Sequence, residues 1–582
     1  MLVQMADGED GVTVEEANDE GVGPGSDLLM GFLSDFRSGE AQKKRADREI
    51  SSANAARRTP HAGSEPAATS ESPVAYQETA TASAGSTGPE QPPAPVPWYG
   101  APAAQVPINV PGRRRGGRLT ITALAALVVL AAAGVAVANR GTSAPSYPAA
   151  WDPRVAPIAQ FVQSQRGLRW KHPVKVDFLA TDKFNALMAK ENAPDPRTTQ
   201  DEQAMFDAMR AIGVASGNVD LAKSAQQFAQ NDVVGQYVDS DHTVYVSGDN
   251  LTPYVRSTLA HELTHALQAQ YFSLEKMRAG HADDDSAVTA LIEGDAVRIQ
   301  NAYEQSLSAA DQELLAQEQQ ATSGHVTGQN TADGIPTFMV DQAQFPYDFG
   351  PTFVAALVAD GGNRRVDAAF KNPPTLDSDI VDPETYVPGA AAPTVAAPIL
   401  PKGAHVVMPA SGFGEVTLLE MLGDQIGFSS AWAAVQGWTQ DRSVVYRQGG
   451  QVCISLSVLN DGPTSAGALS DAGRAWASHL PAASVSQSGM TVDFRACDPG
   501  SAWKAAVRVD DPYGALAVRS VLTYQLITDG RLDSTKATCA SDQLMSTIGP
   551  QKLQGAEQSS DPNSPALQQL TAALPDAVAE CG

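Results

Sequence analysis

The chain has 582 residues and a formal net charge of −26. The length allows three or four domains. Residues 1–118 carry −5 of the charge, which leaves −21 for the remainder. An acidic chain of this kind is not expected to bind nucleic acid or an anionic surface, because phosphate recognition needs clustered lysine and arginine. Acidity by itself indicates solubility and no particular activity.

Residues 1–118 are rich in Ala, Ser, Pro, Gly and Glu. Such a segment cannot bury enough apolar surface to offset chain entropy, so we predict a disordered tail. Between Asp27 and Arg37 the apolar residues recur at helical spacing. This stretch is either an amphipathic segment that docks on a partner or a scattered apolar patch, and both interpretations stay open.

Residues 119–138 are apolar apart from two threonines and one glycine. As a helix, twenty residues match the thickness of about 30 Å of a bilayer core, so we predict a single transmembrane helix followed by a linker over 139–150. Arginines cluster immediately before it, at Arg113, Arg114, Arg115 and Arg118. The positive-inside rule then places the tail, and any partner of the tail, in the cytoplasm. A cleaved signal peptide is the alternative, but its N-terminal region would be short.

All four cysteines follow this segment, at Cys453, Cys497, Cys539 and Cys581. An even number of cysteines outside the cytoplasm indicates two disulfides. Three pairings are possible, and we expect sequential pairing. A zinc ribbon would need a CxxC spacing, which the chain lacks.

The first half of the exterior part alternates between helical and strand patterns. Helical spacing predicts helices over 158–168, 182–190, 201–212, 221–229 and 253–272, and alternation predicts strands over 174–179, 233–238 and 243–247. The last two strands form a predicted hairpin. Strand 243–247 directly precedes the helix 253–272, so we expect it to be a sheet edge on which an extended peptide could pair. An internal strand is the alternative.

The helix predicted over 253–272 contains His261-Glu262-Leu263-Thr264-His265, which reads HExxH. Four residues advance about 400° along an α-helix, so both imidazoles project from one face. Two such nitrogens can bind one zinc ion, and the adjacent carboxylate of Glu262 can act as a base on a zinc-bound water. Two ordinary surface histidines on a helix are the alternative.

A hydrolytic zinc site takes a third protein ligand. The HExxHxxGxxH pattern is excluded, because Gln268 and Tyr271 stand where its Gly and His belong. The helical stretch 284–307 contains Glu293 after a largely apolar run, where a carboxylate would be costly to bury without a cation. Glu293 is the favoured third ligand, with Asp295 and His281 as alternatives.

The HELTH sequence matches the thermolysin-type motif, and its surroundings resemble a family of bacterial zinc metallopeptidases with an HExxH…EGDA signature. The resemblance covers roughly residues 150–500 and is most specific in the zinc blocks. The matching blocks are Gly235–Val238 with Thr243–Val246, Leu259–Gln268, Ala290–Ala296, Tyr347 with Gly350 and Phe353–Val354, Pro373–Pro374 with Pro383–Tyr386, and Gly437–Trp438 with Asp441–Arg442.

The resemblance implies an α+β fold of the zincin-like, gluzincin type, with a catalytic domain over 151–390. It implies His261, His265 and Glu293 as zinc ligands and Glu262 as the base. Thermolysin-like enzymes carry an Asp four residues after the glutamate ligand, where this chain has Val297. The partner that orients the ligands must then come from elsewhere, and Asp285 and Asp295 are candidates.

The C-terminal part is predicted in two pieces, an α+β region over 391–500 that includes a loop over 388–401 and a small helical end over 501–582. Helices are expected over 416–427, 429–435, 515–526 and 566–579, and strands over 443–447, 451–459 and 490–494. Trp438, Asp441 and Arg442 either line a cleft or form a structural cluster, and the structural interpretation is favoured.

These patterns predict a membrane-anchored zinc endopeptidase that acts on proteins or peptides outside the cytoplasm. An oxyanion donor would come from the later half of the chain, and Tyr347 is the candidate, with an ordinary packed tyrosine as the alternative. A non-catalytic envelope scaffold and a zinc peptidase or amidase for cell-wall peptides are the competing functions.

Overall fold

The computed structural model describes residues 147–191, 199–219, 224, 234–280, 285–319, 321, 336–390, 393–504, 511–529, 531–557 and 564–582. The tail over 1–118, the predicted span over 119–138 and His281 lie outside these residues, as does nearly all of the helix expected over 221–229. Among the helices that are described, none is both long enough and apolar enough to cross a bilayer.

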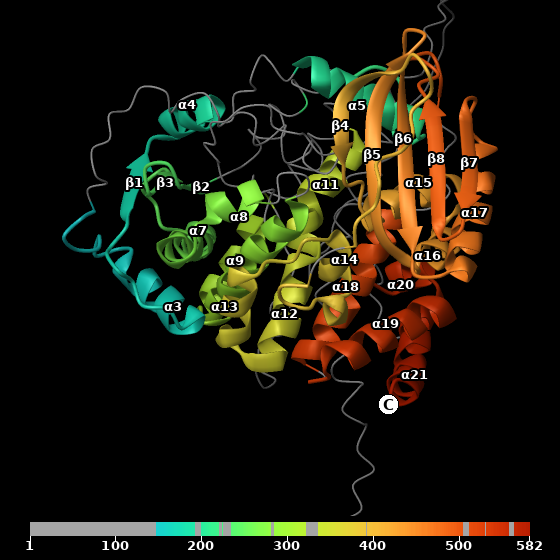
Figure 1. Ribbon diagram of the computed structural model, residues 1–582. Coiled ribbons are helices and arrows are strands. Elements are labelled where there is room, and N and C mark those ends of the chain that lie inside the picture. The colour runs from blue at the N-terminus through green and yellow to red at the C-terminus, as the bar shows by residue number, and fades with distance from the viewer. Residues whose placement is uncertain are drawn as a thin grey trace, which may run out of the picture.

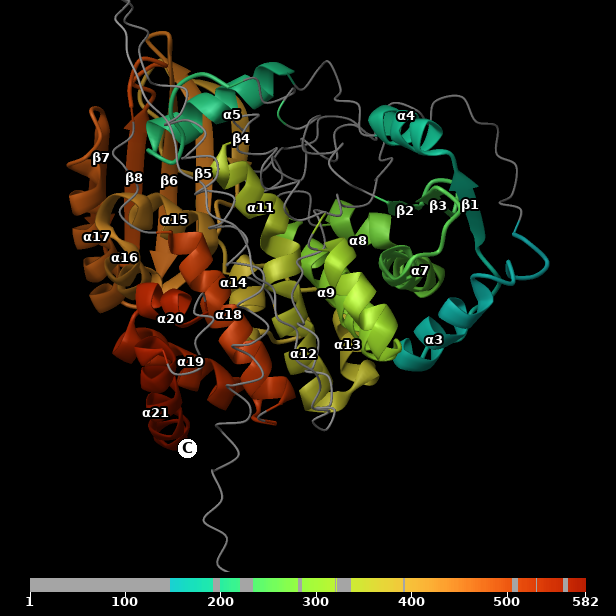
Figure 2. The ribbon, with the colours of Figure 1, turned by 180° about the vertical axis from the view of Figure 1, so that it is seen from behind.

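The described part is a mixed α+β fold with a small sheet at one end, a larger sheet at the other and helices between them (Figure 1). This arrangement confirms the expected α+β class. Figure 2, the same ribbon from behind, shows that the two sheets do not join.

The small sheet has three strands in the order β1-β3-β2, with β1 at Lys175–Leu179, β2 at Gly235–Val238 and β3 at Thr243–Ser247. The hairpin of β2 and β3 is confirmed. The expectation that Thr243–Ser247 is an edge strand is wrong, because β1 pairs with β3 in parallel along its other side. The edge strand of this hairpin is therefore β2.

Helices α3 (Ala156–Arg166) and α4 (Thr181–Glu191) flank β1, and α5 (Thr199–Ala211) follows. Helix α7 (Pro253–Tyr271) packs against the sheet, α3 and α9 (Ser286–Gln305), with the short α8 (Leu274–Gly280) between α7 and α9 in sequence. Val244, Leu263 and Ile299, one each from β3, α7 and α9, lie in the shared core. This core holds the HExxH helix rigidly.

The middle of the molecule is helical, with α11 (Thr337–Asp348), α12 (Gly350–Gly361), α13 (Asn363–Lys371), α14 (Asp377–Val381) and the 3-10 helix η3 (Pro383–Thr385). Helices α9 and α12 meet backbone to backbone. A Cβ placed on Gly294 would lie 2.3 Å from the Gly350 carbonyl, and one on Gly350 would lie 2.2 Å from the Ala290 oxygen. Only glycine allows this approach.

The larger sheet is antiparallel in the order β4-β5-β6-β8-β7. Its strands are β4 (His405–Ser411), β5 (Trp438–Gln448), β6 (Gln451–Asn460), β7 (Ala483–Ser488) and β8 (Thr491–Cys497), and the helices α15 (Glu415–Ile426), α16 (Phe428–Val435) and α17 (Pro463–Ala477) lie beside it. The Trp438 indole donates to Asp441 Oδ2 at 3.0 Å within this core, which supports the structural interpretation of that cluster.

The C-terminal end is helical, with α18 (Pro512–Thr528), α19 (Ser534–Ile548), α20 (Pro550–Glu557) and α21 (Pro565–Glu580). The expected sequential disulfides are confirmed. Cys453 and Cys497 join β6 to β8, and Cys539 and Cys581 join α19 to the end of α21.

One cluster of buried side chains runs from α5 through α9 and α12 to α21. Helix α5 lies against the larger sheet rather than beside α4, as both views show (Figures 1 and 2). The Trp476 indole of α17 donates to the Ile212 carbonyl at 3.0 Å, just after α5. The domain boundaries expected near 390 and 500 therefore fall within a continuous packed core and stay predictions.

Candidate metal centre

The two histidines of the HExxH sequence lie one turn apart on α7. The helix begins at Pro253 behind Thr252, whose side chain accepts a hydrogen bond from the Val255 N–H and so caps the first turn. The imidazole rings of His261 and His265 stand edge to face with their centroids 4.7 Å apart. Both side chains are 1% exposed, so the alternative of two surface histidines does not hold.

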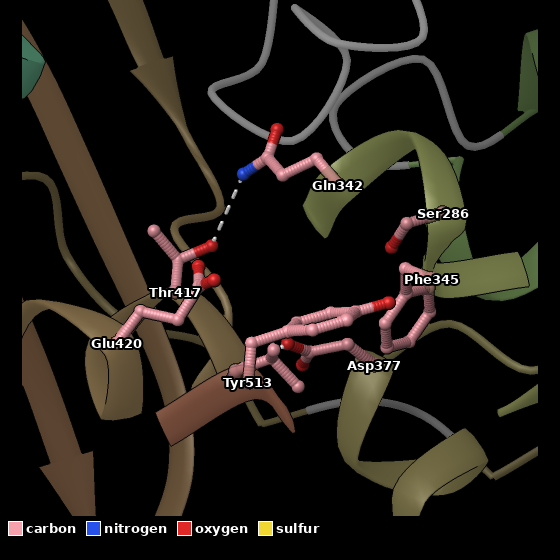
Figure 3. Close-up of a pocket in the computed structure, with 8 residues that line it drawn as sticks. Ser286, Gln342, Phe345, Asp377, Thr417, Glu420 and Tyr513 are labelled. Carbon is pink, nitrogen blue, oxygen red and sulfur yellow. Dashed lines mark hydrogen bonds between the residues drawn. The ribbon is translucent and has the colours of Figure 1, made fainter. Parts of the chain in front are cut away.

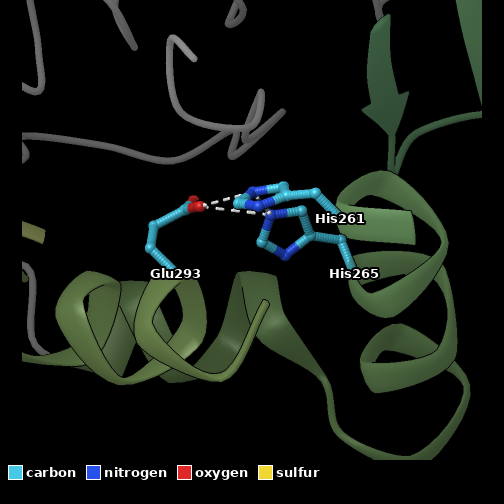
Figure 4. Close-up of side chains that lie close together, drawn as sticks. All are labelled: His261, His265 and Glu293. Carbon is cyan, nitrogen blue, oxygen red and sulfur yellow. Dashed lines mark hydrogen bonds and ion pairs between the residues drawn. The ribbon is translucent and has the colours of Figure 1, made fainter. Parts of the chain in front are cut away.

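The third group is Glu293 on α9, as the sequence favoured. Its Oε2 lies 3.1 Å from His261 Nε2 and 3.2 Å from His265 Nε2, and the two Nε2 atoms are 2.9 Å apart. Figure 4 shows the carboxylate reaching from α9 toward both rings. These three residues form a buried set that could hold a metal ion.

Two glutamines determine which nitrogen of each imidazole carries the proton. Gln300 donates through Nε2 to Ser257 and Glu304, so its Oε1 faces His261 Nδ1 at 2.9 Å as an acceptor. Gln268 donates through Nε2 to Ile292 O and Asp295, so its Oε1 faces His265 Nδ1 at 3.1 Å. Each Nδ1 therefore carries the proton of the neutral ring, and each Nε2 keeps a lone pair.

Two nitrogen lone pairs and one carboxylate oxygen consequently face one another in a buried space. Such an arrangement is unfavourable unless a cation lies between the three acceptors. A tetrahedral zinc ion with bonds of about 2.0 Å separates its ligand atoms by about 3.3 Å, close to the observed 2.9 to 3.2 Å. The donor set and its spacing fit zinc.

Asp295 does not join the three ligands. It faces the other side of α9, where it accepts from Arg166 Nε at 2.6 Å, Arg298 Nη2 at 2.8 Å and Gln268 Nε2 at 3.0 Å. Asp295 thus orients His265 indirectly, through Gln268. Asp285, the other candidate for this role, stands at the N-terminal cap position of α9.

Glu262 is buried beside the ligands, with its Oε2 accepting from the Tyr237 N–H of β2 at 2.7 Å. Burial raises the pKa of Glu262 to about 7, and Glu293 acts in the same direction, while His261 and the Tyr237 N–H lower it. A carboxyl group with a pKa near neutrality can both accept and return a proton.

Burial raises the pKa of Glu293, but positive charge on His265 and His261 lowers it below the ordinary range. With a metal ion bound and both rings neutral, the positive charge of the metal would take this role and keep Glu293 ionised. An ionised carboxylate is the form that binds a metal.

Tyr347, on α11, is 8% exposed and lies beside the same carboxylates. Burial raises the pKa of its hydroxyl well above 10, and the charges of Glu293 and Glu262 raise it further. The hydroxyl is therefore protonated at physiological pH, and it faces the carboxylate of Glu293 as a donor. The contact between Gly294 and Gly350, three residues after Tyr347, fixes its helix against α9.

A small pocket lies between α9, α11, α14, α15 and α18 (Figure 3). Its lining includes Asp377 and Glu420, and Gln342 Nε2 donates to Thr417 Oγ1 across it at 3.5 Å. Asp377 also accepts from the backbone N–H groups of Glu415 and Val416 at the start of α15. The pocket contains none of the three candidate metal ligands and was not predicted from the sequence.

Gln268 and Gln300 are the site residues that the sequence analysis missed. Their spacing from the ligands could have identified them. Gln268 follows His265 by three residues and Gln300 follows Glu293 by seven, so each lies on the ligand-bearing face of its helix. No protein-family model, curated protein or solved structure matches this chain.

Proposed function

We propose that this chain is a zinc-dependent endopeptidase with His261, His265 and Glu293 as the metal ligands. The observation that carries the proposal is the convergence of three buried acceptor atoms, two of them imidazole nitrogens. The protons of the two imidazoles are held on their far nitrogens by Gln268 and Gln300. The base that such chemistry needs, Glu262, follows the first ligand directly.

A zinc ion bound here would supply an acidified water and a Lewis acid for the substrate carbonyl. Glu262 accepts a proton from the attacking water and delivers it to the leaving amine. Its hydrogen bond from the Tyr237 N–H keeps the carboxylate turned toward the ligands while one oxygen remains for the proton.

Tyr347 is the candidate donor to the oxyanion that develops on the substrate carbonyl. Its hydroxyl keeps its proton because burial and two carboxylates raise its pKa. A neutral donor held by packing costs little reorganisation during the reaction. Strand β2 would take the substrate-pairing role expected of β3, since among the described strands β2 is the sheet edge that packs beside α7.

The compartment proposed for this activity is outside the cytoplasm. Two disulfides close the C-terminal part, and disulfides persist in oxidising compartments. The arginine-flanked apolar segment 119–138 supports the same placement through the positive-inside rule. A membrane anchor at that segment belongs to the proposal.

The test uses the full chain, with zinc measured per chain and a mixed peptide library incubated with and without a chelator. We expect about one zinc per chain and cleavage that the chelator abolishes. Glu262→Gln should keep the zinc and lose cleavage by at least about 100-fold, because a positioned base contributes on this scale. The exposed Glu313→Gln variant is the matched control.

Cleavage by the Glu262→Gln protein at the wild-type rate would refute this mechanism. One zinc per chain with no cleavage of any peptide would instead favour a non-catalytic scaffold. Cleavage restricted to cell-wall peptides added to the library would favour the zinc peptidase or amidase of that class.

A further inference from the structure

Among the described residues, Arg278 on α8 is a buried arginine with no hydrogen-bond partner at its Nε and Nη2 atoms. Four arginines are buried in the part of the chain that the structure describes, namely Arg166, Arg210, Arg278 and Arg519. Three of them form ion pairs with carboxylates. Arg278 is 3% exposed, and its Nε and Nη2 have no hydrogen-bond acceptor. A buried cation without a partner is costly, so its retention needs a reason.

The two unpaired atoms of Arg278 form one edge of the guanidinium. The same edge holds carboxylates elsewhere in this chain. Arg210 binds Asp498 through Nε and Nη2, each at 2.6 Å, and Arg519 binds Asp542 through the same two atoms at 2.5 and 3.1 Å. This fork matches the two oxygens of a carboxylate. The empty fork of Arg278 therefore has the shape of a carboxylate site.

Arg278 lies close to the candidate metal centre. Helix α8 begins three residues after the HExxH helix ends, and Leu274 at its start packs in the core with α9. Figure 1 shows α8 beside β2 and α9, the elements that surround the metal ligands. The positive charge of Arg278 also acts on Tyr347, where it opposes the larger upward effects of burial and the carboxylates on the pKa.

The charge of the centre supports a role in binding. With a divalent metal bound by neutral histidines, the two carboxylates of Glu262 and Glu293 balance the metal. Two arginines and two aspartates nearby balance one another in charge, namely Arg166, Arg298, Asp295 and Asp367. Glu304, buried behind Gln300, adds a further acidic group to the centre, and it bonds to Ser257, Gln300 and Gln319 rather than to Arg278. An anionic ligand would supply the partner that the Nε and Nη2 atoms of Arg278 lack among the described residues.

We propose that Arg278 binds a carboxylate of the peptide substrate, so that the enzyme prefers peptides with a carboxylate near the scissile bond. This inference rests on the proposed function. The carboxylate could be the free C-terminus of the peptide or an aspartate or glutamate side chain, and one experiment separates these sources.

The experiment measures equilibrium binding, so that it does not depend on turnover. Zinc-loaded Glu262→Gln full chain is equilibrated with a library of N-acetylated tetrapeptides prepared once as free acids and once as C-terminal amides, and the retained peptides are quantified by mass spectrometry. We expect carboxylate-bearing members to bind about 10- to 100-fold more tightly, as a charge-assisted pair of hydrogen bonds provides. If the free acids bind more tightly than the matching amides, the carboxylate that Arg278 binds is the C-terminus of the peptide. If peptides with aspartate or glutamate are enriched in both libraries, it is the acidic side chain.

Arg278→Met, made in the same background, should remove the preference, and Arg278→Lys should keep only part of it because a lysine cannot form the fork. Lys276→Met, which removes a positive charge from the exposed side of the same helix, should change nothing. Zinc content and melting temperature show whether each variant is folded. If Arg278→Met does not fold, Arg278→Lys carries the comparison.

Equal binding of acids and amides with no enrichment of acidic residues would overturn the role of Arg278, whether or not the wild-type chain cleaves peptides. A preference that disappears in Arg278→Met would support that role even if the wild-type chain cleaved nothing. In that case only the proposed peptidase function would fail.

Discussion

At the scale of single residues, the candidate metal centre is notable for its use of amides. Both histidines donate from Nδ1 to glutamine oxygens. The carboxylates of Asp295 and Glu304 lie one step further out, behind Gln268 and Gln300 respectively. A neutral acceptor fixes the tautomer of the ring without adding negative charge. The centre therefore stays more positive than one supported by carboxylates, which suits the binding of an anionic substrate.

Removing a glutamine acceptor should weaken metal binding. We expect Gln268→Leu and Gln300→Leu each to lower zinc affinity by about 10- to 100-fold, because the ring loses the contact that sets its orientation. Competition with a chromogenic chelator at fixed pH measures the affinity. Gln305→Leu, at the exposed end of α9, is the control.

Gln268 also holds Asp295 and the Ile292 carbonyl, so a lower zinc affinity could reflect damage to the fold. Unfolding of the metal-free variants separates the two effects. Wild-type zinc affinity in both leucine variants would contradict the assignment of the histidine protons to Nδ1.

At the scale of elements, α9 connects three neighbours through three successive residues. Glu293 reaches α7, Gly294 meets α12, and Asp295 pairs with Arg166 on α3. Successive residues on a helix point about 100° apart, so one short motif can bind three elements. The position of the third metal ligand is therefore set by the packing of α9 on both sides.

Gly294→Ala should be strongly destabilising. The added methyl group would lie 2.3 Å from the Gly350 backbone, which cannot move without separating α9 from α12. We expect a loss of about 2–3 kcal/mol in the free energy of unfolding, as overpacking usually costs, together with weaker zinc binding. Urea denaturation measures the first quantity.

Gly467 is the matched control, because it lies within α17 and a Cβ there would meet nothing within 4 Å. Gly467→Ala should be neutral or stabilising by up to about 1 kcal/mol, since alanine loses less entropy in a helix. Equal effects of the two substitutions would argue against a tight contact between α9 and α12.

At the scale of the whole molecule, buried charges join the helical middle to the C-terminal part. Asp377 accepts from the first N–H groups of α15, and Arg519 of α18 donates to Asp382 and Asp542. Glu415, at the start of α15, is buried among these carboxylates. The contacts of Arg519 with Val381 and Asp382 connect segments more than 100 residues apart and so join the two parts.

Glu415 should make stability depend on pH. Burial, and then the charges of Asp382 and Asp377, raise its pKa well above the ordinary 4.5, so the folded chain holds this proton more tightly than the unfolded chain. Stability should therefore fall as the pH rises from about 4.5 through the raised value. Glu415→Gln should reduce that fall, with a gain on the order of 1–3 kcal/mol at pH 8 and little change at pH 4.5.

Denaturation at both pH values measures the effect, and Glu580→Gln, an exposed carboxylate on α21, is the control. A larger stabilisation by Glu415→Gln at low pH than at high pH would show that the sign of this argument is wrong.

Much of the candidate site followed from local patterns. The spacing of His261 and His265 placed both on one helical face, and the apolar surroundings of Glu293 indicated a buried carboxylate. Helix spacing also indicated that Glu293 and Asp295, about 200° apart around the helix, could not both face one ion. The edge strand was predicted wrongly, because the long-range pairing of β1 with β3 leaves no mark in the hairpin itself.

The sequence by itself indicated the candidate ligand pattern, the candidate base, many of the helices and strands, and a cysteine order consistent with sequential disulfides. Each of these depends on residues that are near in sequence, or on counting. Only the tertiary structure decided which strand is the edge, that Gln268 and Gln300 hold the histidine protons, and that Arg278 has no partner in the described part. Those features arise where distant segments pack together. Local periodicity does not predict them, because it depends only on neighbouring residues and not on the contacts that a side chain makes with another segment.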